Sequence, residues 1–306
     1  MKIETSPKVS VIIPTYNRPQ LIQRTVQSAL DQTYSNIEII VVDGDPTGAT
    51  SKKLEAFAGE RVRSVKDFVF AQLPPTGTVQ DRSNIARNRN AGIRIATGTY
   101  IAILDDDDIW LDREKIAKQV RFFEEHPEYS LCGGGVIGLY RESGGKTIEV
   151  KELFPEKDED IRNIMLTARG LVHSTIMYKK SDWERIGGYN EINTIREDWD
   201  LHLRLGKIGK MYNFPNYFAC FFVGEHEKDH ISIYGHYITA HSLDILMRYR
   251  KDYPGFYKAF CNHMLHYLYG FIPARLRMGF RPIAQRIQRA IAKILGISSH
   301  EQVIKG

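Results

Sequence analysis

The sequence predicts an α/β protein whose mixed, mainly parallel sheet is flanked by helices. Short β-branched runs alternate with segments whose apolar residues recur at helical spacing, the pattern of parallel strands joined by crossover helices. The strand-like run Tyr100–Leu104 ends in four consecutive aspartates, Asp105–Asp108. Because open α/β sheets bind ligands at the carboxyl ends of their strands, these carboxylates predict a site at one edge of the sheet.

The predicted elements follow in chain order. The N-terminal part contains a strand at 9–13, a helix at 18–30, a strand at 37–42, helices at 50–58 and 83–96, and the strand at 100–104. The later part contains an amphipathic helix at 115–125, short antiparallel strands punctuated by the glycines between 133 and 145, a buried strand at 211–223 and helices from about His236 onward. The run Gly133–Gly138 matches a dinucleotide-binding fingerprint in letters, but no long helix follows it, so that function is not expected.

Composition places the chain among ordinary globular proteins. Of 306 residues, 42% are hydrophobic and 26% are charged. Three scattered cysteines are too few for a disulfide framework or a zinc site and fit a reducing compartment. Met1–Lys8 lacks the architecture of a signal peptide, and no window reaches the roughly 18 apolar residues of a membrane span. The expected location is cytoplasmic, with peripheral attachment to the inner face of the cell membrane as an open alternative.

The C-terminal part of the chain is strongly basic. No acidic residue lies between Asp252 and Glu301, although the whole chain has a net charge of only +5. Residues 275–293 combine six cations with an isoleucine stripe, which is typical of a helix lying on an anionic membrane surface. The same apolar face could instead pack on the body of the protein or on a second subunit in a homodimer. A nucleic-acid partner is not expected.

Three predicted strands end in groups that a nucleotide requires. The first is followed by Tyr16, a ring on which a base can stack; the second ends at Asp43; the third ends at Asp105–Asp108. Clustered carboxylates suit Mg²⁺ or Mn²⁺, which commonly also hold substrate phosphates. Taken singly, these residues could be core packing, a turn cap and a solvated acidic turn. Their order along the chain favours a shared site.

At this point the sequence resembles the family 2 glycosyltransferases of the GT-A fold. The resemblance covers roughly residues 8–232. It rests on the segments Val9–Arg18, Glu38–Gly44, Arg89–Ile93, Gly98–Asp108, Ile186–Glu191 and Glu197–Arg204. It implies a glycosyltransferase domain over 1–232, with a nucleotide-binding half at 1–110 and an acceptor half at 111–232, and a helical, basic extension at 233–306.

The resemblance also implies roles for individual residues. Asp107 is the expected metal ligand for Mn²⁺ or Mg²⁺, with His226 near the metal and His230 as its rival. The residues expected to contact the donor nucleotide are Pro14, Thr15, Tyr16, Arg18, Asp43, Arg89, Asn90, Asp105 and Asp106. Where many members have Asp-Asp-Gly-Ser, this chain has Asp43-Gly-Asp-Pro46, which leaves the nucleotide base open.

Asp198 matches the general base of the inverting members. An inverting transfer needs a carboxylate that takes the proton of the attacking acceptor hydroxyl. Asp198 also precedes a segment with helical spacing, where an acidic residue can act as an ordinary N-terminal cap. Both interpretations stay open at the level of sequence.

The predicted function is a metal-dependent inverting glycosyltransferase. It moves a sugar from a nucleotide-sugar, expected to be UDP-linked, to a hydroxyl of a glycan or a lipid-linked acceptor. One alternative is a nucleotidyltransferase acting on sugar phosphates, but the stretch after Pro14 offers Arg18 and no Gly-rich, Lys-bearing loop. A second alternative is a non-catalytic module that binds nucleotide-sugars.

Overall fold

A computed structural model describes residues 6–44, 47–50, 52–54, 67–72, 84–141, 145–192, 195–223 and 235–270. The chain divides into two compact units, each of which is described by itself. The first comprises 1–161 and 171–227, and the second comprises 162–170 and 228–306. A short segment from the middle of the chain therefore joins the C-terminal unit, which the sequence did not indicate. The predicted domain boundary at residue 232 stays a prediction.

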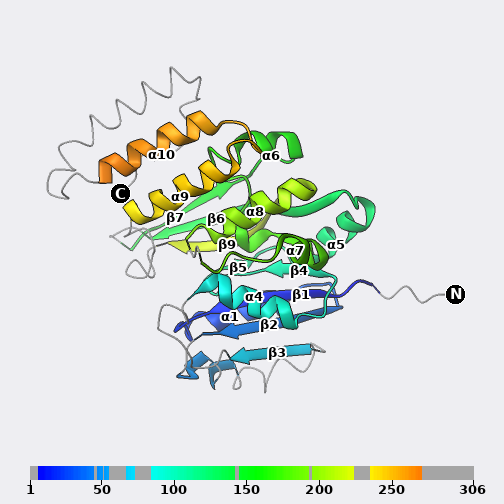
Figure 1. The fold of residues 1–306 in the computed structure, drawn as a ribbon. Coiled ribbons are helices and arrows are strands. Elements are labelled where there is room, and N and C mark those ends of the chain that lie inside the picture. Colours follow the sequence, from blue (N-terminus) through cyan, green and yellow to red (C-terminus); the bar gives the residue numbers. More distant parts are fainter. Residues whose placement is uncertain are drawn as a thin grey trace. The chain divides into compact units, whose positions relative to one another are not determined.

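Among the described residues, nine strands form one mixed sheet in the first unit. Strand β1 (Val9–Thr15) pairs in parallel with β2 (Ile37–Asp43) and with β4 (Tyr100–Ile103). Strand β3 (Asp67–Gln72) adds to β2 in parallel, and β8 (Met177–Lys179) adds to β4 in the antiparallel sense (Figure 1). The predicted α/β class with a mixed sheet is confirmed.

The sheet continues through two long strands, β6 (Tyr129–Arg141) and β9 (Lys210–Val223), which run parallel to each other. Strand β7 (Thr147–Glu152) pairs with β6, and β5 (Ile109–Trp110) pairs with β9, both in the antiparallel sense. The predicted antiparallel pairing in this region is confirmed, because β6 pairs with β7 and β8 in that sense. The predicted shortness was wrong for β6, which runs through Gly133, Gly134, Gly135 and Gly138 as one strand.

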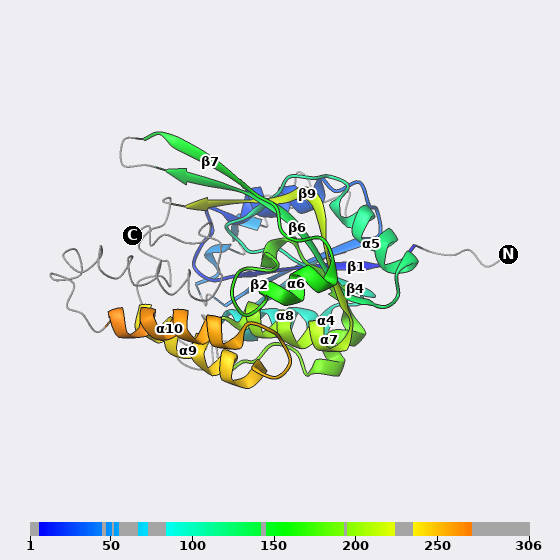
Figure 2. The ribbon, with the colours of Figure 1, turned by 90° about the horizontal axis from the view of Figure 1, so that it is seen from above.

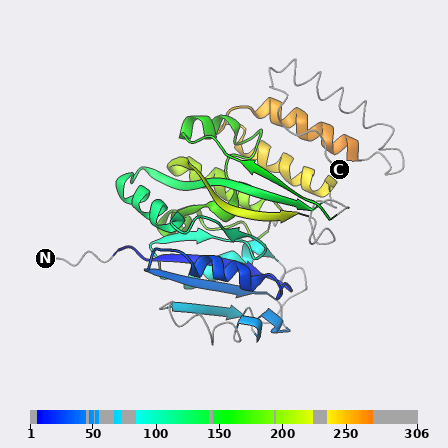
Figure 3. The same ribbon diagram turned by 180° about the vertical axis from the view of Figure 1, so that it is seen from behind.

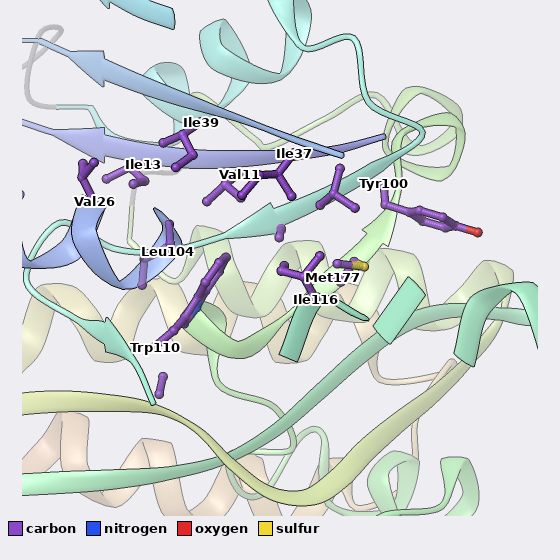
Figure 4. Close-up of a cluster of buried hydrophobic side chains, with 14 of the residues drawn as sticks. Val11, Ile13, Val26, Ile37, Ile39, Tyr100, Leu104, Trp110, Ile116 and Met177 are labelled. Carbon is purple, nitrogen blue, oxygen red and sulfur yellow. The ribbon is translucent and has the colours of Figure 1, made fainter. Parts of the chain in front are cut away.

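Helices cover both faces of the sheet (Figures 1 and 2). Helices α1 (Ile22–Leu30) and α5 (Lys115–Glu125) lie on one face, where alternate residues of the strands meet them in a continuous apolar core. The residues of this core shown in Figure 4 include Val11, Ile13, Val26, Ile39, Leu104, Trp110 and Ile116. The opposite face carries α4 (Ile85–Ile95), α7 (Lys180–Ile186) and α8 (Glu197–Ile208).

Further helices include α6 (Asp158–Ile164), which spans the boundary between the two units, and a short 3₁₀ segment, η2 (His173–Thr175), which precedes β8. The predicted helices at 83–96 and 115–125 are confirmed. Most of the predicted helix at 50–58 lies outside the described residues.

In the second unit, α9 (Gly235–Tyr249) and α10 (Phe256–Gly270) pack against each other (Figure 3, yellow and orange). The turn between them ends at Gly255, whose φ of 83° is the left-handed conformation that glycine adopts without strain. No helix in the described part of the chain is long and apolar enough to cross a membrane. Residues 275–293, for which membrane docking is predicted, lie outside the described residues.

Candidate active site

The carboxyl ends of three parallel strands meet at one edge of the sheet. Thr15 at the end of β1 is in register with Asp43 at the end of β2. The amide of Leu104, just after β4, donates to the carbonyl of Ile12 at 3.1 Å, so the chain leaves the sheet there with its four aspartates. Pro14 and Asp43 are buried, whereas Tyr16, the next residue after β1, is half-buried. The predicted convergence of strand ends is therefore present.

Two of the four aspartates share one cation. The Nη1 atom of Arg18 lies 3.1 Å from Oδ1 of Asp106 and 2.8 Å from Oδ2 of Asp107. The hydroxyl of Thr15 also donates to Asp106 at 2.7 Å. Burial raises the pKa of Asp106 to about 7, and the charge of Asp107 adds to this effect while Arg18 opposes it. In this structure a guanidinium contacts two of the carboxylates for which the sequence suggested a metal ion.

The rest of the acidic loop is held by neutral donors. The hydroxyl of Ser174 in η2 donates to the carboxylate of Asp108 and accepts from the amide of Asp105 at 3.2 Å. The hydroxyl of Thr25 in α1 lies 2.9 Å and 2.8 Å from the backbone carbonyls of Asp106 and Asp108. These contacts fix the loop from two sides and so define the directions in which its carboxylates point.

Arg89 on α4 joins the two acidic motifs of the sequence. Its side chain is 1% exposed, with Nη2 at 2.5 Å from Oδ1 of Asp105 and Nη1 at 2.6 Å from Oε1 of Glu197. One guanidinium thus faces two carboxylates, and it cannot neutralise both. Burial accordingly raises the pKa of Glu197 despite Arg89, whose own pKa rises further above its ordinary value. We call this arrangement the Arg89 bridge.

Asp198 is the residue after Glu197, one of the two carboxylates of the Arg89 bridge, and lies in the first turn of α8. Its Oδ1 accepts from the amide of Trp199 at 2.8 Å. The residue at the N-cap position is Arg196, which has a left-handed φ of 65° and makes no side-chain capping bond. Burial would raise the pKa of Asp198, but the charges of Arg196 and Arg89 and the bond from the amide of Trp199 favour the ionised form and the pKa is lowered, so the carboxylate is ionised at neutral pH. An ionised carboxylate can accept a proton, and it also stabilises the helix start.

Asn90, a predicted donor contact, makes its observed bonds within the protein. Its amide nitrogen donates to the carbonyl of Tyr189 at 2.9 Å and to Oε1 of Glu191 at 2.7 Å, and its Oδ1 accepts from the amide of Tyr189 at 2.8 Å. A Cβ at Gly188 would lie 2.9 Å from the same Oδ1, which explains the glycine in this turn. Asn90 therefore holds the turn after α7, and a donor contact by it stays a prediction.

The predicted metal ligands are only partly described. His226 and His230 lie outside the described residues, and within them no group of three or more His, Cys, Asp or Glu side chains could hold a metal ion. The side chain of Asp107 is 31% exposed at the edge of the sheet. This donor set fits an ion of the Mg²⁺ type, which protein binds through one or two carboxylates while waters and substrate phosphates complete the shell. It does not fit an ion held by protein ligands alone.

Sequence reasoning missed the polar residues beneath the site. Ser174 and His173 lie on η2, and His202 lies one turn after Asp198 on α8. No local pattern marks the first two, because they reach the site through pairing of β8 with β4. The spacing of four residues between Asp198 and His202 on a predicted helix was a usable signal for the third.

A mixed sheet whose strand ends gather an acidic loop and a second acidic motif is the arrangement of an α/β protein that binds its ligand at the carboxyl ends of its strands. The family model for glycosyl transferase family 2 matches residues 10–187. The chain belongs to this family and is a glycosyltransferase.

Named relatives agree with this membership. The putative glycosyltransferase EpsE of Bacillus subtilis is 30% identical over 211 residues, covering 68% of this chain and 69% of EpsE. WfaP of Escherichia coli, a UDP-Glc:α-D-GlcNAc-diphosphoundecaprenol β-1,3-glucosyltransferase, is 38% identical over 116 residues, which cover 38% of this chain and 41% of WfaP.

A solved structure shares the fold. The mannosyltransferase PcManGT from Pyrobaculum calidifontis, in complex with GDP-Man and Mn²⁺, superimposes with a TM-score of 0.58 over 96% of this chain and 79% of that one. The two are 17% identical, so the likeness concerns the fold. The predicted GT-A architecture is thereby confirmed.

Proposed function

We propose that this protein is a metal-dependent, inverting glycosyltransferase that moves a sugar from a nucleotide-sugar to a hydroxyl of a glycan or lipid-linked acceptor. The Arg89 bridge is the observation that supports this most directly. It joins the acidic loop after β4, through Asp105, to Glu197, the residue before Asp198. A donor held at the loop would therefore have its reacting sugar near an ionised carboxylate.

The donor side would be formed by the ends of β1, β2 and β4. In this proposal Pro14, Thr15, Tyr16 and Asp43 contact the base and ribose of the donor. Asp105, Asp106 and Arg89 contact its ribose and phosphates. The support is that these residues lie at or next to the ends of neighbouring strands and that Thr15 contacts Asp106 and Arg89 contacts Asp105. Arg18, already beside Asp107, supplies a positive charge for the diphosphate. Asp107, with His226 or His230, would hold Mn²⁺ or Mg²⁺, and a divalent ion bound there stabilises the charge that develops on the departing diphosphate.

The transfer is a single displacement. The acceptor oxygen attacks the anomeric carbon, Asp198 takes the proton of that hydroxyl, and the bond between the anomeric carbon and the diphosphate oxygen breaks. The nucleoside diphosphate leaves with the bonding electrons, and the configuration at the anomeric carbon inverts. General-base assistance of this kind contributes about 10² to 10⁴ in rate.

The relatives guide the choice of substrates. WfaP is named for UDP-glucose and a diphosphoundecaprenol-linked acceptor, and PcManGT holds GDP-mannose with Mn²⁺. The sequence after β2 departs from the common motif at Gly44, so both UDP- and GDP-sugars belong in the donor panel. A lipid-linked acceptor also agrees with the proposed attachment of residues 275–293 to an anionic membrane; self-association into a homodimer stays a prediction.

The first prediction tests the metal. Purified protein with a panel of UDP- and GDP-sugars should release nucleoside diphosphate only with Mn²⁺ or Mg²⁺. Asp107→Asn should lower the rate by at least about 10²-fold, because a neutral amide is a poorer ligand for a hard cation than a carboxylate. Glu149→Gln, on exposed β7, is the matched control and should behave as wild type. Full activity in excess chelator would refute metal dependence. Transfer of a nucleotide to a sugar phosphate would support the nucleotidyltransferase alternative. Binding of a donor without turnover would support the non-catalytic module.

The second prediction tests the base. Asp198→Asn keeps the size of the side chain and its ability to accept from Trp199, but it removes the proton acceptor. Transfer should fall by about 10²-fold or more while donor affinity, measured by calorimetry, stays within about twofold. Asp182→Asn makes the same change in the first turn of α7 and should leave transfer unchanged. Equal transfer by the Asp198 variant and wild type would leave Asp198 as a helix-start residue.

A further inference from the structure

The guanidinium of Arg18 contacts the residue that is proposed to bind the metal ion. Its Nη1 atom lies 2.8 Å from Oδ2 of Asp107 and 3.1 Å from Oδ1 of Asp106. Both contacts join full charges, and both are made by the same nitrogen atom. An ion that binds the carboxylate of Asp107 therefore meets a cation that is already there.

Arg18 differs in exposure from Arg89, whose guanidinium also contacts a carboxylate of the acidic loop. The side chain of Arg89 is 1% exposed, whereas that of Arg18 is 28% exposed. A cation buried between carboxylates cannot leave without stranding an uncompensated buried charge. A partly exposed cation loses less when it changes partners, because water solvates it during the change. Arg18 is therefore the exchangeable cation of this loop, and Arg89 is the fixed one.

The acidic loop keeps other contacts when Arg18 changes partners. The second carboxylate oxygen of Asp106, Oδ2, accepts from the hydroxyl of Thr15 at 2.7 Å. The backbone carbonyl of Asp107 accepts from Nη2 of Arg24 at 3.1 Å. The carboxylate of Asp107 can thus be released while its backbone stays in place. This side chain is 31% exposed, so a ligand from solvent reaches it.

A diphosphate changes the competition between Arg18 and a divalent ion. Both cations interact with Asp107, and they repel each other in a partly buried site where screening is weak. The oxygens of a diphosphate supply negative charge for both. Guanidinium groups bind phosphate oxygens through paired, charge-assisted hydrogen bonds. Ions of the Mg²⁺ type combine one or two carboxylates with substrate phosphates. A bound diphosphate therefore relieves both the competition and the repulsion.

We propose that Arg18 is an internal counter-ion that prevents Asp107 from binding a divalent metal tightly until the diphosphate of a nucleotide takes over the guanidinium. Metal and nucleotide then raise each other's affinity by the same factor, as linkage requires. Return of Arg18 to Asp107 favours release of the metal together with the nucleoside diphosphate. This inference rests on the proposed function, in which Asp107 binds the metal, and it adds the regulation of that binding.

Measurements of Mn²⁺ binding test the inference without turnover. Free Mn²⁺ is followed by electron paramagnetic resonance while the full-length protein is titrated, alone and with saturating UDP or GDP. Arg18→Gln removes the cation and keeps a polar side chain. We expect this variant to bind Mn²⁺ about tenfold more tightly than wild type without nucleotide, and to bind UDP or GDP with Mn²⁺ about tenfold more weakly.

The opposite signs distinguish competition from a structural role. If Arg18 only maintained the shape of the loop, its removal would weaken the binding of Mn²⁺ and of the nucleotide together. That result, or an unchanged Mn²⁺ affinity of nucleotide-free Arg18→Gln, would overturn the proposal. Arg18→Lys keeps the charge and should retain weak Mn²⁺ binding. Arg94→Gln is the matched control, because it removes one cation from an exposed ion pair with Glu191 and should change either affinity by less than about twofold.

A spectroscopic measurement follows the exchange in the unmodified protein. The ¹⁵N signals of arginine side chains respond to the partner of each guanidinium, and the signal of Arg18 is assigned by its loss in Arg18→Lys. With Mg²⁺, which is diamagnetic, and saturating UDP or GDP, we expect the Arg18 signal to shift. Mg²⁺ alone at the same concentration should leave it in place. An identical Arg18 signal in the free and the nucleotide-bound protein would contradict the exchange.

Asp107→Asn separates this inference from the proposed function. If this variant loses Mn²⁺ binding while Arg18→Gln binds Mn²⁺ no more tightly than wild type, Asp107 is the metal ligand and Arg18 is not its competitor. If Asp107→Asn binds Mn²⁺ as wild type does, or if wild type binds no Mn²⁺ even with nucleotide, the proposed metal site is wrong and the inference fails with it.

Discussion

Arg89 is a buried cation whose two hydrogen-bonding ends contact carboxylates from segments 108 and 16 residues away. Burying such a group is costly in itself, so the arrangement is poor evidence for stability as such. Once it is buried, however, removing the cation leaves Asp105 and Glu197 without their partner. The planar fork of a guanidinium can hold both carboxylates at once, which a point charge on a lysine cannot.

Substituting Arg89 should therefore be costly. Arg89→Gln should lower the free energy of unfolding by about 3 kcal/mol, because two carboxylates lose their cation in a buried site. Urea denaturation followed by circular dichroism measures this. The control is Arg94→Gln on the same helix, where the ion pair with Glu191 is largely exposed and a change within about 0.5 kcal/mol is expected. Equal stability of the two variants would contradict the energetic role of the Arg89 bridge.

The buried side chain of His202 should make stability depend on pH. The pKa of His202 is about 4 in the folded protein against an ordinary 6.5, so below 6.5 the unfolded chain binds a proton that the folded chain does not. Its contribution to stability is complete above pH 6.5 and is lost as pH falls towards 4, by up to about 1.4 kcal/mol per pH unit. Unfolding free energies between pH 7.5 and 5 should decline less steeply in His202→Gln. Parallel slopes for the variant and wild type would show that His202 titrates normally.

At the scale of single residues, the sequence predicted some of the residues that come together at the candidate active site. Residues at or just after strand ends could be placed, because the ends of parallel strands meet at one edge of the sheet. Thr15 and Arg18 both contact Asp106 there. The partners of the loop on η2 could not be predicted, since their approach depends on the pairing of β8 with β4. Nor could it be foreseen that Arg18 would lie between two aspartates.

At the scale of elements, the glycines of β6 show why a local pattern misled. Glycine usually interrupts a strand, so the run Gly133–Gly135 predicted short pieces. In the structure these positions make room for neighbours: a Cβ at Gly134 would lie 2.5 Å from the ring of Phe218, and one at Gly133 2.9 Å from Oδ1 of Asn213. The register of β6 against β9 shifts at Gly135, but β9 pairs with β6 on both sides of this position, and so the strand persists. Such pairing between distant segments cannot be seen in the local sequence.

Close packing at Gly134 predicts a specific rescue. Gly134→Ala should lower the free energy of unfolding by about 1–3 kcal/mol, the usual cost of an extra methyl in a filled site. Phe218→Leu leaves space beside that position, so the double variant should lose less than the sum of the two single variants. Thermal and urea unfolding of all four proteins give the coupling energy. Additive losses would mean that the added methyl is accommodated by movement elsewhere.

At the scale of the whole molecule, predictions from the sequence describe the first unit, with its mixed sheet, better than they describe the second unit. Alternation of strands and helices has a strong periodic signal, and the predicted strands at 37–42 and 100–104 both pair in parallel with the predicted strand at 9–13. The inclusion of 162–170 in the second unit has no such signal, because it depends on packing between segments far apart in sequence. The positive charge of residues 275–293, in contrast, could be predicted from the sequence, because it depends only on which residues are present and not on the fold.

That charge leads to a prediction about the intact protein. Each cation near an anionic lipid surface contributes on the order of 1 kcal/mol to binding, and an isoleucine stripe adds apolar contact. The full-length protein should co-sediment with vesicles rich in phosphatidylglycerol at low salt and progressively less as salt screens the attraction. Replacing Arg286, Arg289 and Lys293 by glutamine should lower the binding constant by about 10²-fold.

Replacing Lys52, Lys53 and Lys146, which are exposed in the first unit, changes the net charge equally and should leave binding nearly unchanged. If both triple variants bind as wild type does, the basic stretch does not dock to membranes, and its apolar face would then be assigned to packing within the protein or between subunits.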